Sequence, residues 1–160
     1  SGVRAGRRKN IEEEIMEIKL LKENTGIQTH INILQGIISR MATNSSNCKT
    51  WAITIIAAII VLLIDKSKTN IFYIAYVPLA MFFLLDCFYL GLERHFRKLY
   101  NDFINNLEKD DFNYNNVYKI QGPNKLSSKL ALTLKASISF SIFPFYGIIA
   151  ILIYVVQKIS

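Results

Sequence analysis

Three apolar blocks dominate the pattern of hydrophobic and polar positions along the chain. They run from Trp51 to Ile64, from Ile71 to Leu92 and from Ser137 to Val156. The second and third blocks are each about as long as the ~20 apolar residues that a membrane-spanning helix needs. Both are hydrophobic on every side of a helix, which leaves no polar face to meet water. The pattern therefore predicts membrane spans rather than the core helices of a soluble domain.

The first block is shorter, and its length alone is more typical of a buried helix in a soluble protein. Extension back through Cys48 and Lys49, whose long aliphatic stem can snorkel, gives a helix over residues 48–64 of about 25 Å. Slight thinning of the bilayer accommodates that length. We therefore expect three transmembrane helices, over residues 48–64, 71–92 and 137–157. The alternative is two spans and a third helix that lies in the membrane interface.

The polar segments between these blocks also favour helices, so the predicted fold class is all-α. Residues 1–47 form an amphipathic region, with one helix over residues 10–42 or two helices with a break near Asn24-Thr25-Gly26. Asn44 to Asn47 mark either a helix boundary, as N-cap residues, or a polar collar on a continuous helix. Residues 93–136 form a second helical segment that continues the second span as a basic helix and turns near residues 121–124.

An apolar stripe in the N-terminal region repeats with alternating steps of four and three residues, which is a heptad-like seam. We expect self-association to bury it, because one subunit offers no soluble partner large enough for such a stripe. The seam consists of Ile27, Ile31, Leu34, Ile38 and Met41.

The distribution of charge predicts an orientation in the membrane. The chain has 160 residues, is 51% hydrophobic and carries a net charge of +7. Residues 1–50 hold eight Lys and Arg and residues 92–136 hold eight more, while the loop 65–70 holds two and the tail 157–160 one. Because cytoplasmic loops carry the excess of Lys and Arg, both basic blocks should be cytoplasmic. The N-terminus is then inside and the C-terminus outside.

Asp86 is the most informative single residue, because an ionisable side chain inside an apolar block is costly and faces protein or water. It lies sixteen residues after Asn70, and Lys49 lies sixteen residues before Asp65. In an antiparallel hairpin this spacing places the two side chains at the same level, near the cytoplasmic face. We expect Asp86 to accept a contact from Lys49 or Thr50 of the same or a neighbouring subunit. The pairing is either static or part of a gate or ion path.

Other candidate chemistry is sparse. Arg94, Arg97 and Lys98 follow the second span, where they favour contact with anionic lipid, and a direct role in nucleic-acid binding is not expected. The sequence has no Gly-rich phosphate loop, no Ser/His/Asp set and no zinc motif, and its two histidines stand apart. We therefore expect no enzyme activity, no cofactor and no metal.

Two stretches, HINILQGIISRMATNSSNCKTWAITIIAAIIVLLIDKSK and LLDCFYLGLERHFRKLYNDF, resemble a family of small bacterial inner-membrane proteins of the octameric RipA type. The resemblance covers residues 28–105. This chain departs from the shortest members in having a third apolar block, so the subunit number is not carried over. The matching residues are Arg40, Met41, Ala42, Asn44, Ser45, Lys49, Trp51, Asp86, Tyr89, Leu90, Glu93, Phe96 and Arg97.

The resemblance implies a homo-oligomer of the bacterial inner membrane. It also implies a link to anti-phage defence, because such small proteins often occur beside anti-phage modules. The expected function is a membrane-perturbing or pore-forming effector in anti-phage defence, engaged by a cytoplasmic defence protein or signal. The rival function is a non-conducting membrane anchor or scaffold that recruits a cytoplasmic enzyme or nucleic-acid complex. Only Thr54 interrupts the first apolar block with a polar side chain, which is thin support for a water-filled path.

Overall fold

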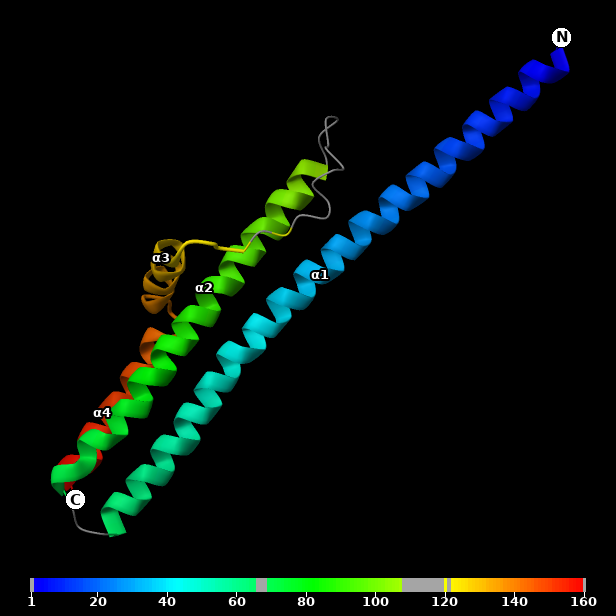
Figure 1. The fold of residues 1–160 in the computed structure, drawn as a ribbon. Coiled ribbons are helices and arrows are strands. Elements are labelled where there is room, and N and C mark those ends of the chain that lie inside the picture. The colour runs from blue at the N-terminus through cyan, green and yellow to red at the C-terminus, as the bar shows by residue number, and fades with distance from the viewer. Residues whose placement is uncertain (1, 66–68, 108–119, 121, 160) are drawn as a thin grey trace.

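The computed structural model describes residues 2–65, 69–107, 120 and 122–159 (Figure 1). Within these residues every regular element is helical, so the predicted all-α class is confirmed. Residues 66–68 of the predicted loop, and residues 108–119 and 121 of the predicted cytoplasmic segment, lie outside the described residues. The elements are α1 (Gly2–Asp65), the 3-10 helix η1 (Thr69–Ala75), α2 (Tyr76–Leu107), α3 (Leu126–Ser137) and α4 (Phe143–Ile159).

Helix α1 is continuous from Gly2 to Asp65, which makes it about 96 Å long at 1.5 Å per residue. It passes without a break through both places where the sequence left a boundary open, near Gly26 and over Asn44–Asn47. Asn44–Asn47 therefore form the polar collar on a continuous helix, rather than a helix boundary. Ser45 illustrates why they do not end the helix, because its hydroxyl is directed to a side chain of α2. The N-terminal region and the first predicted span thus share one helix.

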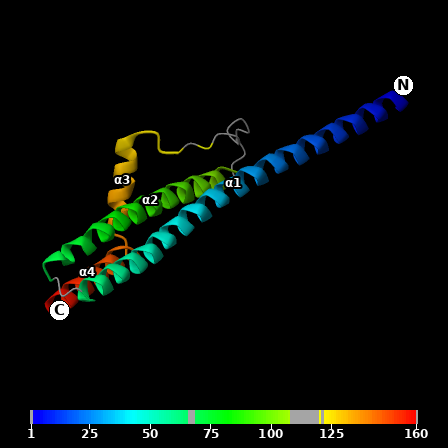
Figure 2. The ribbon, with the colours of Figure 1, turned by 60° about the horizontal axis from the view of Figure 1, so that its bottom comes forward.

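Helix α2 runs antiparallel beside α1 and forms the predicted hairpin with it (Figures 1 and 2). The second predicted span begins as the 3-10 helix η1 and becomes α-helical at Tyr76. Pro78 lies in the first turn of α2, where its missing N–H costs no hydrogen bond. As predicted, the helix continues beyond Leu92, to Leu107, and carries the basic residues with it.

The part of α2 beyond Leu92 covers the apolar seam of α1. Leu34 is only 1% exposed, and the other four seam residues are half-buried. The rings of His30 and Phe103 lie 4.2 Å apart between centroids. The expectation that one subunit lacks a partner for the seam is therefore wrong, because the extension of α2 beyond Leu92 supplies it. Self-association stays a prediction that the seam alone no longer requires.

The third apolar block is not one helix, which corrects the predicted span 137–157. Helix α3 ends at Ser137, and a turn follows in which the Ile142 N–H donates to the Ser139 carbonyl at 3.0 Å. Helix α4 then starts at Phe143, with Pro144 in its first turn. Two helical segments, Asn24–Ile64 and Phe72–Leu107, are long and apolar enough to cross a membrane, and α4 is a shorter apolar helix of 17 residues.

Helices α1, α2 and α4 pack around a shared apolar core. Its members are mostly small or β-branched residues, so the helices approach closely. Helix α4 lies along the hairpin at the end where α1 meets η1 (Figures 1 and 2). The buried core includes Ala52, Ile56, Ala75, Leu79, Ile149 and Ile153.

Helix α3 lies across α2 rather than along it. Figure 1 shows α3 nearly end-on while α2 lies in the plane of the view, and Figure 2 shows α3 lengthwise across α2. Gly91 permits this crossing, because a Cβ there would lie 2.9 Å from the backbone carbonyl carbon and oxygen of Leu132. The close approach fixes where α3 sits along α2.

We predict that Gly91→Ala displaces α3, because backbone atoms of Leu132 cannot yield to a new methyl group as a flexible side chain would. Hydrogen–deuterium exchange of the 126–137 amides in the detergent-solubilised protein should become faster. Gly36→Ala is the matched control, since nothing lies within 4 Å of a Cβ there and the alanine favours the helix. Equal exchange in both variants would contradict the proposed close contact.

Candidate functional site

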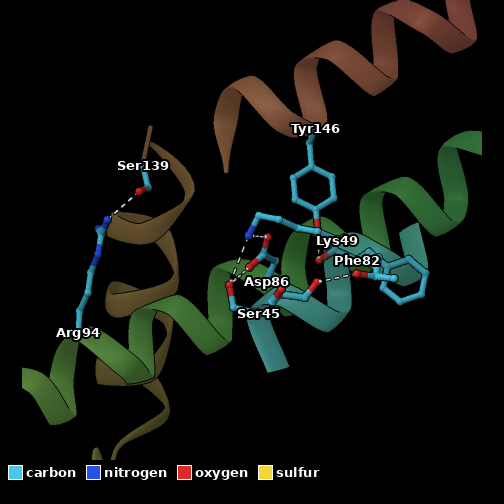
Figure 3. Close-up of polar contacts among 9 residues, drawn as sticks. Ser45, Lys49, Phe82, Asp86, Arg94, Ser139 and Tyr146 are labelled. Carbon is cyan, nitrogen blue, oxygen red and sulfur yellow. Dashed lines mark hydrogen bonds and ion pairs between the residues drawn. The ribbon is translucent and has the colours of Figure 1, made fainter. Parts of the chain in front are cut away.

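The candidate site is a buried polar cluster between α1 and α2, formed by Ser45, Lys49 and Asp86 (Figure 3). Ser45 and Lys49 lie one turn apart, so both point from the same face of α1. Asp86 faces them from α2 and is 0% exposed. The cluster therefore occupies the level that the hairpin spacing predicts.

Each carboxylate oxygen of Asp86 has its own partner. Lys49 Nζ lies 2.7 Å from Oδ2, and the Ser45 hydroxyl donates to Oδ1. Oδ2 accepts no hydrogen bond besides this ionic contact. Lys49 Nζ also lies 3.4 Å from Ser45 Oγ, so the three side chains form a closed set. Asp86 is thus compensated within one chain.

The energetics of the cluster favour specificity over stability. Burial of two opposite charges costs several kcal/mol per ion, and their attraction offsets this only when geometry and hydrogen bonding are good. Removal of one partner leaves the other charge buried and unpaired, which costs about 3–5 kcal/mol. A shift of α1 by one turn against α2 has the same effect. The cluster therefore fixes the register of the hairpin.

Helix α4 closes the cluster on a third side. The Tyr146 hydroxyl donates to the Phe82 carbonyl at 3.1 Å (Figure 3). The Phe83 and Tyr146 rings meet edge to face at 5.5 Å. Lys49 Nζ lies 6.0 Å from the centre of the Phe145 ring, within the range of a cation–π contact. Protein rather than lipid therefore surrounds most of the ion pair.

The other predicted site residues lie outside this cluster. The Thr50 hydroxyl donates to the Ser46 carbonyl at 3.3 Å and is exposed, so Thr50 does not share the role expected for it beside Asp86. Arg94 donates to Ser139 Oγ at 2.7 Å, and thereby joins α2 to the turn after α3.

The other two cations that were predicted to follow the second span also lie on α2, beyond Asp86. Arg97 pairs with Glu93 one turn earlier, with 2.6 Å between Nη2 and Oε1. Lys98 is exposed. Their exposure fits the predicted contact with anionic lipid, which stays a prediction.

Sequence reasoning missed two members of the site, Ser45 and Tyr146. Ser45 stands four residues before Lys49, a spacing that places both on one helix face, but its residue type also suits an N-cap. Tyr146 gave no signal, because it lies in an apolar block distant in sequence. Within the described residues, no group of three His, Cys, Asp or Glu side chains is arranged as metal ligands. The chemistry of the cluster is that of an ion pair that holds helices together or releases them.

Comparisons of the chain with protein-family models, with curated proteins and with solved structures found no match. The resemblance to the RipA-type family therefore stays a prediction that rests on residues 28–105. Three of its matching residues, Ser45, Lys49 and Asp86, are the residues that meet in the cluster.

We predict that Lys49→Met destabilises the detergent-solubilised protein by about 3–5 kcal/mol, because Asp86 is left charged and unpaired. The double variant Lys49→Met/Asp86→Leu should recover most of that loss, since no buried charge remains. Unfolding curves of both variants and of the wild type measure the effect. Thr50→Ala is the control and should change little. Equal loss in the single and double variants would show that Lys49 acts through packing alone.

Proposed function

We propose that this protein is a homo-oligomeric effector of the bacterial inner membrane, which perturbs the bilayer when its cytoplasmic helices are engaged. The observation that carries the proposal is the continuity of α1 from Gly2 to Asp65. A continuous α-helix is stiff over this length, so a partner bound to its N-terminal half acts directly on the membrane segment. An anchor needs no such mechanical connection, because a flexible linker would hold its cargo equally well.

The Ser45–Lys49–Asp86 cluster supplies the element on which that connection acts. It lies on α1 where the helix passes from the predicted cytoplasmic region into the apolar segment. A shift or rotation of α1 separates Lys49 and Ser45 from Asp86 and leaves charged groups among apolar side chains. The cluster therefore has two discrete states, with the ion pair closed or separated, and a switching element requires two such states.

The proposed oligomer supplies the place for a path across the bilayer. The polar groups of the cluster are closed within one chain, so a path has to form between copies or by opening of the cluster. The membrane segment offers an apolar groove of about 350 Å³ between α1 and α4 that a neighbouring copy can fill. The groove is lined by Ile53, Ala57, Ile60, Phe145, Ile148 and Leu152.

A non-conducting anchor or scaffold is the second candidate. It is favoured by the chemistry of the exposed surface, because most exposed side chains of the described span residues are apolar, among them Trp51, Val61 and Leu84. Such a surface suits lipid and offers little lining for water. The role in anti-phage defence has its support in the sequence resemblance alone.

We predict that Ser45→Ala makes the effector more easily activated. Loss of the hydroxyl leaves Asp86 Oδ1 without its donor, which costs about 1–3 kcal/mol, and each 1.4 kcal/mol changes a two-state ratio about tenfold. Bacteria that express the variant should depolarise at a lower protein level than wild-type expressers, as a potential-sensitive dye reports. Ser46→Ala, at the adjacent exposed position, is the matched control and should behave as the wild type.

Two results would refute the effector. One is an unchanged membrane potential for every variant at every expression level, with the protein present in the membrane, which would favour the anchor. The other is a monomeric mass for the detergent-solubilised wild type, which would remove the oligomer on which the path depends.

We predict that the C-terminus lies outside the inner membrane, because α4 follows two antiparallel spans and the basic segments stay cytoplasmic. Alkaline phosphatase fused after Ser160 should then be active, and a green fluorescent protein at the same position should be dark. The same fusions after Leu107 should give the opposite pattern. A fluorescent C-terminal fusion would contradict a third span and leave α4 on the cytoplasmic side.

A further inference from the structure

Helix α3 carries an apolar stripe that no part of the described chain covers. Leu126, Leu130 and Leu134 recur every four residues and are all exposed, Leu126 to 72%. The side of α3 that packs on α2 is a different one, marked by Leu132 and the buried Ala136. The leucine stripe is therefore free of the contact that holds α3 in place.

The turn after α3 extends this stripe toward α4. Ile138, Phe140 and Phe143 are all strongly exposed, Phe140 to 93%. Exposed apolar patches of this kind mark surfaces that meet a membrane or a partner. The patch is continuous in sequence with α4, which is apolar along most of its length.

The position and direction of α3 suit the surface of a bilayer. Gly91 and Arg94, which hold α3 and its turn, lie five and eight residues beyond Asp86, which is about 7–12 Å along the helix axis. Asp86 itself is at the predicted cytoplasmic end of the spans. Since α3 crosses α2 (Figures 1 and 2), it lies roughly in the plane of the membrane if α2 crosses it.

The charged side chains of α3, of its N-cap and of Arg94 beside its turn are all positive, and the nearby Glu93 of α2 is paired with Arg97. Lys125 and Lys135 are exposed at its two ends, Lys129 is half-buried, and Arg94 lies beside its turn. Residues 120–160 contain no Asp or Glu. An amphipathic helix with a basic polar side is typical of binding at an anionic lipid interface.

We propose that α3 and the turn 138–142 form an interfacial helix that docks on the anionic headgroups of the bilayer, with its leucine stripe among the acyl chains. A second copy is the weaker occupant, because two such surfaces would bring their lysines together without a compensating acid. A nucleic acid would use the lysines but not the exposed leucines and phenylalanines. The inference rests on the membrane insertion that the proposed function includes, but not on conduction.

The test uses the full chain reconstituted into vesicles of phosphatidylcholine with and without phosphatidylglycerol. Leu130→Trp and Leu134→Trp, each in a Trp51→Phe background, place a single fluorophore on the stripe. Ser128→Trp in the same background is the matched control, because Ser128 lies on the opposite side of α3 and is also exposed. The wild-type Trp51, which is exposed on the first span, reports insertion independently.

Quenching of Leu130→Trp and Leu134→Trp by brominated acyl chains, stronger with phosphatidylglycerol present, is the expected result. Ser128→Trp should instead be quenched by aqueous iodide. Lys125→Gln and Lys135→Gln should each lower the ratio of docked to undocked α3 about fivefold, the factor for about 1 kcal/mol.

Two results on the stripe tryptophans would overturn the proposal. Iodide quenching of the stripe tryptophans as strong as that of Ser128→Trp would place them in water. Protection of the stripe from both quenchers would show that protein covers it. Failure of brominated lipid to quench Trp51 would instead refute membrane insertion itself, and with it the proposed function. Quenching of Trp51 without quenching of the stripe tryptophans refutes only the docking of α3.

Discussion

The fold depends on one constraint, which is that the Asp86 carboxylate is buried and must be neutralised where it lies. Lys49 and Ser45 meet this requirement from one face of α1, and no other alignment of the hairpin does so with the same residues. Apolar helices slide past one another at little cost, because one aliphatic contact resembles the next. A buried ion pair has one acceptable geometry, and the remaining contacts between α1 and α2 follow from the register that it imposes. Helix α4 then packs where Tyr146 finds the Phe82 carbonyl.

Those features that follow from periodicity and charge were predictable from the sequence. The all-α class, the hairpin, the extension of α2 beyond Leu92 and the level of Lys49 with Asp86 all rest on counting residues along helices of known rise. The seam residue Leu34 was recognised as part of a buried stripe, but its partner was not, because the sequence does not show which helix packs against that stripe. An apolar stripe on a helix indicates that another surface covers it, but it does not identify that surface.

The features that were missed depend on contacts between segments distant in sequence. The apolar block Ser137–Val156 reads as one span, yet α3 turns away before Pro144 because Gly91 admits the backbone of Leu132 and Arg94 holds Ser139. Neither contact leaves a trace in the local pattern. Ser45 had two compatible interpretations, as a cap and as a partner of an acid, and only the position of Asp86 decides between them. Tyr146 is one of several aromatic residues in apolar segments, and the hydrogen bond from its hydroxyl to the Phe82 carbonyl is evident only from the packing of α4 on α2.

Paired and exposed charges lie at different levels along α2, and this difference relates the cluster to α3. Polar groups at the level of Asp86 are closed upon one another, whereas the cations about two to three turns further along α2, among them Arg94 and Lys98, are exposed. This is the order expected of a protein in a bilayer, since unpaired charge is costly in hydrocarbon and favourable at an anionic surface. If α3 rests on that surface while α1 passes through it, the two helices contact α2 at neighbouring levels. Headgroups then hold α3, whereas a partner bound to the N-terminal half of α1 acts on that helix. A load on the N-terminal half of α1 then acts against the ion pair, because α2 is held by α3 and cannot follow.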